Sequence, residues 1–151
     1  MNRIPVILLV EDNPDDEMLT RRAILSSGIA VEVFTASDGP QALELLLGTY
    51  DPRRLPDLRP DLVLLDLKLP RLNGLEVLKT LRLHTSTRSL PVVILTSSAE
   101  QSDIQNAYEI GCNSYIQKPV DFEQFTRAIH AACRYWLQAN RQIRPDKEIS
   151  A

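Results

Sequence analysis

The chain alternates short apolar runs with helix-like stretches, and this alternation limits the folds that it can adopt. Five runs predict strands: 6–10, 31–36, 62–65, 92–95 and 114–116. Three of them are nearly continuous in Val, Ile and Leu, which favours a parallel sheet covered on both faces. Five strand–helix units in a row predict an α/β fold with a doubly wound, five-stranded parallel sheet.

The stretches between the runs carry the signals of helix ends. Asn13-Pro14 offers an N-cap and a proline at the first helical position, and Asp15, Asp16 and Glu17 follow as a solvated acidic first turn. Three capping pairs are predicted: Asp38 with Gln41, Asn73 with Glu76, and Asp121 with Gln124. Three glycines follow helical stretches, where a left-handed residue ends a helix: Gly28, Gly48 and Gly111.

Length and charge exclude several classes of protein. The chain has 151 residues, enough for one domain with its own core, and 17 basic against 20 acidic residues give a net charge of −3. That balance argues against a general nucleic-acid or membrane binder. No apolar run approaches the roughly 20 residues that span a bilayer. Cys112 and Cys133 predict neither a zinc site nor a disulfide, so the expected location is the cytoplasm.

Polar residues stand where the predicted strands end. Glu11 and Asp12 follow the first strand, Asp66 the third, Thr96 the fourth and Lys118 the fifth. Ligands of doubly wound sheets bind outside the carboxyl ends of the strands, so these side chains are expected to share one crevice. Neighbouring carboxylates repel one another, and Mg²⁺ is the hard cation that best stabilises such a set while leaving room for phosphate oxygens.

Four motifs in this order resemble the receiver domain of two-component response regulators, over roughly residues 4–138. They are LVEDN (9–13), LLDLKLPRLNG (64–74), ILTSS (94–98) and SYIQKP (114–119). The resemblance implies a flavodoxin-like (βα)5 receiver fold and a phosphorelay partner, a sensor histidine kinase. It implies no enzymatic activity beyond the domain's own phosphorylation and dephosphorylation.

The same resemblance implies a role for each residue of the crevice. Asp66 would accept the phosphoryl group and bind the metal together with Asp12, with Glu11 through water and with the backbone carbonyl of Lys68. Thr96 and Lys118 would bind phosphoryl oxygens, and Thr96 and Tyr115 would form the conformational switch. The bond before Pro119 would be cis. The family more often has Asp-Asp where this chain has Glu11-Asp12, which is expected to alter the metal geometry. Lys68 and Ser98 fill positions that tune phosphoryl lifetime in the family.

Two features outside the crevice resemble the small response regulators that work with cyanobacterial and bacterial phytochromes. One is the long connection at 48–60. The other is the last helix, whose apolar face is predicted to comprise Phe122, Phe125, Ile129, Ala132 and Trp136. Tyr135 and Leu137 lie outside that face, so their apolar surface is expected to be available for contacts in a homodimer. Residues 1–140 are expected to form the receiver domain, and 141–151 a polar tail with no effector domain.

Three alternatives remain open at the level of the sequence. A phosphatase of the haloacid-dehalogenase type also phosphorylates an aspartate, but it places an acid where this chain has Lys68. A flavodoxin-like FMN protein has a phosphate loop rich in Ser, Thr and Gly, whereas Glu11 and Asp12 would repel a phosphate there. A receiver-like docking scaffold without phosphotransfer is the third.

Overall fold

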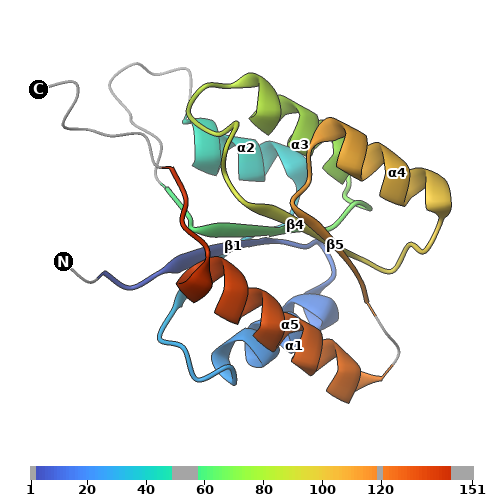
Figure 1. The fold of residues 1–151 in the computed structure, drawn as a ribbon. Helices are drawn as coiled ribbons and strands as arrows, with labels where there is room; N and C mark the ends of the chain where they lie inside the picture. Colours follow the sequence, from blue (N-terminus) through green and yellow to red (C-terminus); the bar gives the residue numbers. More distant parts are fainter. Residues whose placement is uncertain (1–2, 49–57, 119–120, 144–151) are drawn as a thin grey trace, which may run out of the picture.

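Five parallel strands form one sheet in the computed structural model, which describes residues 3–48, 58–118 and 121–143 (Figure 1). The strands are β1 (Val6–Val10), β2 (Glu32–Ala36), β3 (Leu62–Leu65), β4 (Val92–Thr96) and β5 (Ser114–Gln117). Their order across the sheet is β2-β1-β3-β4-β5, and every neighbouring pair is parallel. The predicted strands are confirmed, each to within one residue at either end.

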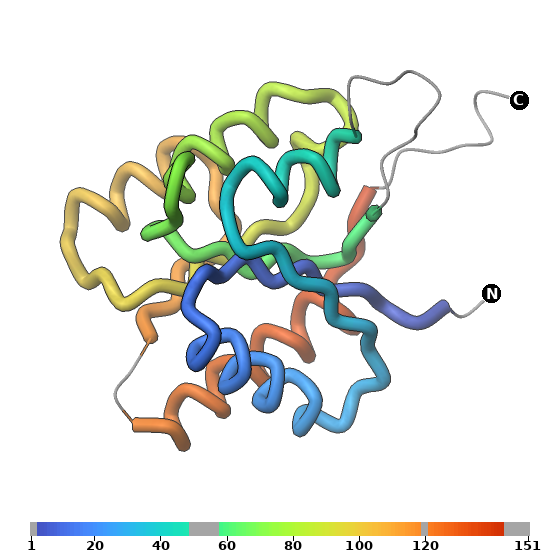
Figure 2. Tube along the Cα trace, turned by 180° about the vertical axis from the view of Figure 1, so that it is seen from behind, coloured from blue at the N-terminus to red at the C-terminus, as the bar shows by residue number. Residues whose placement is uncertain are grey.

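Helices cover both faces of the sheet, as Figures 1 and 2 show from opposite sides. On one face lie α1 (Pro14–Leu25) and α5 (Phe122–Cys133), and on the other lie α2 (Gly39–Leu47), α3 (Gly74–Leu83) and α4 (Gln101–Ile110). The doubly wound architecture is therefore confirmed. Among the described ranges, no helix has the length and apolar character needed to cross a membrane.

The core is divided by the sheet into two apolar clusters. Successive strand residues point to opposite faces, so Ile7 and Leu9 pack toward α1 and α5 while Leu8 and Val10 pack toward the other three helices. All four side chains are almost fully buried. Burial of both faces explains why β1, β3 and β4 are continuous apolar runs rather than alternating patterns.

The helix N-caps lie where the sequence places them. The Asn13 carboxamide oxygen accepts the N–H groups of Asp15 and Asp16, and the Asp38 and Asn73 side chains each accept the N–H three residues later. The pairing of Asp121 with Gln124 is wrong, because the Asp121 carboxylate accepts the N–H of Glu123, one residue earlier. The cap itself is retained. Gly28, Gly48 and Gly111 all have positive φ angles, as predicted.

The last helix differs in part from the predicted pattern. Phe125, Ile129 and Ala132 are buried, but Phe122, the first residue of α5, is 45% exposed. After Cys133 the chain continues as a wider π-helix, η1 (Arg134–Ala139). The wider turn brings Leu137 onto the core cluster, contrary to expectation, whereas Tyr135 stays exposed.

Three predicted features fall wholly or mostly outside the described residues: most of the long connection at 48–60 (residues 49–57), the peptide bond before Pro119 and the end of the tail (144–151). The start of the tail is described. Gln142 donates a side-chain hydrogen bond of 3.0 Å to Asp61, the buried residue that precedes β3.

Candidate functional site

The polar residues predicted at the strand ends lie together at one edge of the sheet. Backbone hydrogen bonds continue the sheet one residue past its strands and fix these positions. The Asp66 N–H donates to the Val10 carbonyl at 3.1 Å, and the Lys118 N–H donates to the Thr96 carbonyl at 2.7 Å. The Glu11 N–H likewise donates to Ala36. The site is therefore built on the rigid sheet rather than on mobile loop tips.

Lys118 is the centre of the charge arrangement. Its Nζ lies 2.5 Å from Glu11 Oε1, 3.1 Å from Asp66 Oδ2 and 3.2 Å from Asp16 Oδ2. Burial alone would disfavour the ammonium, but the hydrogen bond to Glu11 and the charge of Asp66 raise the pKa of Lys118. The side chain therefore stays charged and binds the two buried carboxylates.

Glu11 is the more deeply buried of the two acids that follow β1, and its side chain has fixed partners. Burial raises the pKa of its carboxyl group, and the adjacent Lys118 ammonium opposes this rise. The second carboxylate oxygen accepts the N–H of Asn13 at 3.1 Å. Both oxygens are thus held in place by the start of α1 and by the lysine.

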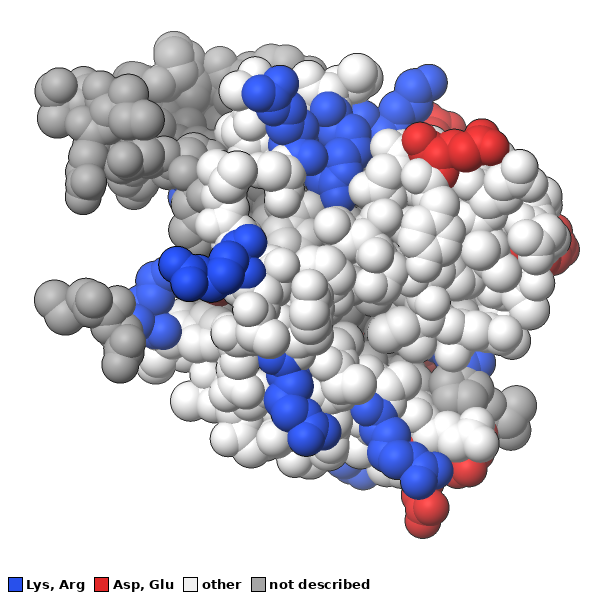
Figure 3. Space-filling model, viewed as in Figure 1, with Lys and Arg blue, Asp and Glu red and all other residues white. Residues whose placement is uncertain are grey.

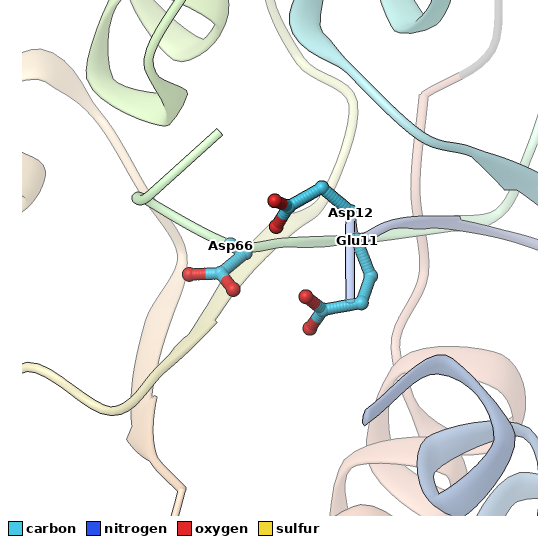
Figure 4. Close-up of side chains that lie close together, drawn as sticks. All are labelled: Glu11, Asp12 and Asp66. Carbon is cyan, nitrogen blue, oxygen red and sulfur yellow. The ribbon is translucent and has the colours of Figure 1, made fainter. Parts of the chain in front are cut away.

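Three carboxylates lie close enough to share a cation. Ligand atoms of Glu11, Asp12 and Asp66 all lie within 4.8 Å of one another, and the side chains face a common space at the ends of β1 and β3 (Figure 4). Asp12 is exposed, whereas Glu11 and Asp66 are buried. A set of hard oxygen donors that is open to solvent on one side fits Mg²⁺, which keeps several of its waters.

Thr96 carries a polar atom with no partner. Its side chain is fully buried at the end of β4, and Oγ1 has no hydrogen bond within the described structure. Thr20 and Thr126 share this state but lie on α1 and α5. A buried hydroxyl without a partner is costly, so Thr96 has spare hydrogen-bonding capacity at the end of β4. Its predicted role in binding a phosphoryl oxygen stays a prediction.

Tyr115 is linked to the segment that follows β4. Its hydroxyl donates to the Ser98 carbonyl at 2.9 Å, and the Ser98 hydroxyl donates to Asp103 on α4 at 2.6 Å. The tyrosine is half-buried against the α4 side of the sheet. The predicted switch residue is therefore hydrogen-bonded to the loop that follows Thr96, the last residue of β4.

The loop after Asp66 is held close to the acid. The Lys68 N–H donates to Asp66 Oδ1 at 3.1 Å, while its side chain is exposed. The Gly74 N–H donates to the Leu67 carbonyl at 2.9 Å. A Cβ on Gly74 would stand 2.7 Å from Leu67 Cα and closer still to the Asp66 carbonyl oxygen, so only glycine fits there. Metal ligation by the Lys68 carbonyl stays a prediction.

Asp16 is the site residue that the sequence interpretation missed. It was expected in a solvated turn, but its carboxylate contacts Lys118. The available signal was its position. Asn13 is the N-cap of α1, so Asp16 is the third helical residue and lies beside the strand ends.

Charged groups elsewhere are more dispersed. On the face seen in Figure 3, the basic side chains stand in separate groups with uncharged surface between them. Nucleic-acid binders usually carry a continuous basic patch or stripe. The expectation that nucleic acid is not a partner stays a prediction.

Comparison with known proteins gives a consistent picture. A family model described as "Response regulator receiver domain" matches residues 7–130. The probable methanogenesis regulatory protein FilR2 of Methanothrix harundinacea is 40% identical over 141 residues, 93% of this chain and 88% of that protein. Response regulator Rcp1 of Synechocystis sp. is 33% identical over 133 residues, covering 88% of this chain and 89% of Rcp1.

Two solved structures are also similar. The phosphorylated cyanobacterial phytochrome response regulator RcpA matches with a TM-score of 0.85 at 33% identity, covering 93% of this chain and 99% of that one. The Mn²⁺-bound form of Rcp1 matches with a TM-score of 0.82 at 31% identity, covering 92% and 99%.

Proposed function

Since the chain belongs to the response regulator receiver domain family, we propose that Asp66 accepts a phosphoryl group from a sensor histidine kinase. The observation that carries this proposal is the convergence of charge on Asp66. One oxygen of its carboxylate faces the Lys118 ammonium, and two further acids that can hold a metal ion lie beside it. A receiver is a signalling module, and this set of groups suits the handling of one phosphoryl group.

Phosphoryl transfer would use the groups at this edge as follows. A carboxylate oxygen of Asp66 attacks the phosphorus of a phosphohistidine, and the bond from phosphorus to the imidazole nitrogen breaks. The electron pair of that bond returns to the imidazole, which takes up a proton. The product is an acyl phosphate on Asp66. Lys118 and the free hydroxyl of Thr96 would each bind a phosphoryl oxygen and stabilise the charge.

Glu11, Asp12 and Asp66 would hold Mg²⁺, with the Lys68 carbonyl as a further ligand. A bound Mg²⁺ would neutralise part of the negative charge that builds up on the phosphoryl oxygens. The chemistry of three carboxylates supports this choice, and Rcp1 has been solved in a Mn²⁺-bound form. Asp12, the exposed member, leaves one side of the site open to water and to the donor.

Lys118→Ala is expected to weaken binding of beryllofluoride with Mg²⁺ by about 10- to 100-fold, because one charge-assisted hydrogen bond is worth roughly 1.5–3 kcal/mol. Beryllofluoride imitates the phosphoryl group on an aspartate. The Kd is measured by isothermal titration calorimetry. Removal of the ammonium also leaves Glu11 and Asp66 without their cation, so Mg²⁺ should raise the Tm of the variant more than that of the wild type.

Lys79→Ala is the matched control, since Lys79 is an exposed lysine on α3. It should bind beryllofluoride as the wild type does. Equal Kd values for Lys118→Ala and wild type would remove Lys118 from the phosphoryl site. Circular dichroism in Mg²⁺ checks that both variants are folded.

The relatives support a phytochrome-type histidine kinase as the partner. RcpA and Rcp1 are similar to this chain along most of their length, and RcpA is described as a phytochrome response regulator. We propose the same class of kinase for this chain, acting in the cytoplasm. Phosphotransfer from a purified phytochrome kinase to Asp66, faster than from unrelated kinases, is the direct test.

Signalling would proceed from Thr96 to Tyr115 and onward through protein contacts. Movement of Thr96 toward a phosphoryl oxygen would pull the loop that follows it, and the Tyr115 hydroxyl is hydrogen-bonded to the Ser98 carbonyl in that loop. We propose a homodimer formed through the last helix as one readout. Tyr135 is the largest exposed apolar side chain of η1. Its ring packs edge-on against that of Trp136, with 4.8 Å between the ring centroids.

Tyr135→Ala is expected to weaken the homodimer by about 10- to 100-fold, the usual effect of truncating an aromatic anchor at an interface. Analytical ultracentrifugation with and without beryllofluoride measures the dissociation constant. Tyr108→Ala is the control, because Tyr108 on α4 is equally exposed, at 50% against 52%. Equal weakening by both variants, or a wild type that is monomeric in both conditions, would contradict an interface centred on η1.

A further inference from the structure

Lys118 has its full complement of hydrogen-bond acceptors before any phosphoryl group arrives. An ammonium has three N–H donors, and three carboxylate oxygens surround it, from Glu11, Asp66 and Asp16. A phosphoryl oxygen can bind this ammonium only if one of the three carboxylates gives up its place. The proposed function, on which this inference rests, therefore requires an exchange of partners at Lys118.

The three carboxylates differ in how readily they can leave. Asp16 makes the longest of the three contacts, at 3.2 Å, and its side chain is 43% exposed, against 2% for Glu11 and 10% for Asp66. An exposed carboxylate regains its hydration when it is released, whereas a buried one is left without a partner. Asp66 itself carries the phosphoryl group, and Glu11 is further tied to the Asn13 N–H.

We propose that Asp16 is a positioning residue that holds the place of a phosphoryl oxygen on Lys118. In the unphosphorylated protein it holds the ammonium next to Asp66. On phosphorylation a phosphoryl oxygen takes this position, and Asp16 returns to solvent at the start of α1. Asp16 lies outside the group of acids that can share a metal ion, so its part is separate from metal binding.

The proposal predicts the direction of a change in affinity. Asp16 competes with the phosphoryl group, so its neutralisation should make binding tighter. Asp16→Asn keeps the size of the side chain and removes its charge. The Kd for beryllofluoride with Mg²⁺ is expected to fall by about two- to fivefold, the range set by a partly exposed ion pair. Asp16→Glu keeps the charge and should behave more like the wild type.

Asp15→Asn is the matched control. It removes the same charge from the same helical turn, but Asp15 is exposed, and among the described residues its carboxylate has no hydrogen-bond or ion-pair partner. It should leave the Kd unchanged. A double-mutant cycle adds a readout that general stabilisation would not produce: in the Lys118→Ala background, Asp16→Asn should lose its effect.

Calorimetric titration of these five variants and the wild type with beryllofluoride and Mg²⁺ tests the proposal. An Asp16→Asn variant that binds as the wild type does, binds more weakly, or gains no more than Asp15→Asn would overturn it. So would a full effect in the absence of Lys118. A wild type that binds no beryllofluoride would instead refute the proposed function, so the two failures are distinguishable.

Discussion

Asp66→Asn is expected to reduce labelling by acetyl phosphate in Mg²⁺ to background. The amide keeps the size of the side chain and can still accept the Lys68 N–H, which lies 3.1 Å from Asp66 Oδ1. It lacks the nucleophilic carboxylate that would form the proposed acyl phosphate, and it removes one charge from the proposed metal site. Intact-protein mass spectrometry measures the addition of one phosphoryl group.

Asp61→Asn is the control for this loss. Asp61 and Asp66 are both buried, and they stand at opposite ends of β3. Removal of the Asp61 charge weakens its contacts with Arg3 and Gln142 but leaves the residues around Asp66 in place. The variant should therefore be labelled as long as it is folded. Persistent labelling of Asp66→Asn at the wild-type level would refute the assignment of Asp66 as acceptor.

Gly74→Ala is expected to lower the free energy of unfolding by about 3 kcal/mol or more, at the upper end of the usual range for overpacking. The new methyl group would meet the backbone of Asp66 and Leu67, which cannot turn aside as a flexible side chain can. For a domain of this size the Tm should fall by roughly 6–12 °C. Thermal unfolding followed by circular dichroism measures it.

Gly28→Ala separates this clash from simple backbone strain. Gly28 has a positive φ of 83°, but a Cβ there would meet nothing within 4 Å. Its cost should be about 1 kcal/mol, from the left-handed conformation alone. Gly74→Ala should also slow phosphorylation, because the Asp66 backbone must shift. Similar stability of the two alanine variants would contradict a close approach at Gly74.

The fold and the placement of polar residues at the strand ends were predictable because both depend on short-range patterns. Continuous apolar runs such as 62–65 indicate buried parallel strands, and parallel strands bring the residues that follow them to one edge. Lys118 contacts both Glu11 and Asp66, as their positions at the strand ends predict. Their roles in phosphorylation stay predictions.

The errors arose where the contacts of a side chain depend on how separate helices and strands pack together. Asp16 looked like one acid among three in a first turn, and only the position of Lys118 beside α1 singles it out. Leu137 was predicted to lie outside the apolar face because a regular α-helix was assumed. The π-helix after Cys133 has more residues per turn, so it changes the direction in which the following side chains point. Periodicity cannot predict such a change.

Asp61 has a practical consequence for experiments on this protein. Arg3, near the start of the chain, and Gln142, beyond the last helix, both donate to this one carboxylate, and the Val6 N–H does so at 2.8 Å. The two ends of the described chain therefore leave the sheet close together, at the edge opposite Asp66 (Figure 1). Surface attachment, a fluorescent reporter or a circular permutation that uses these ends would leave the edge of the sheet that carries Asp66 uncovered.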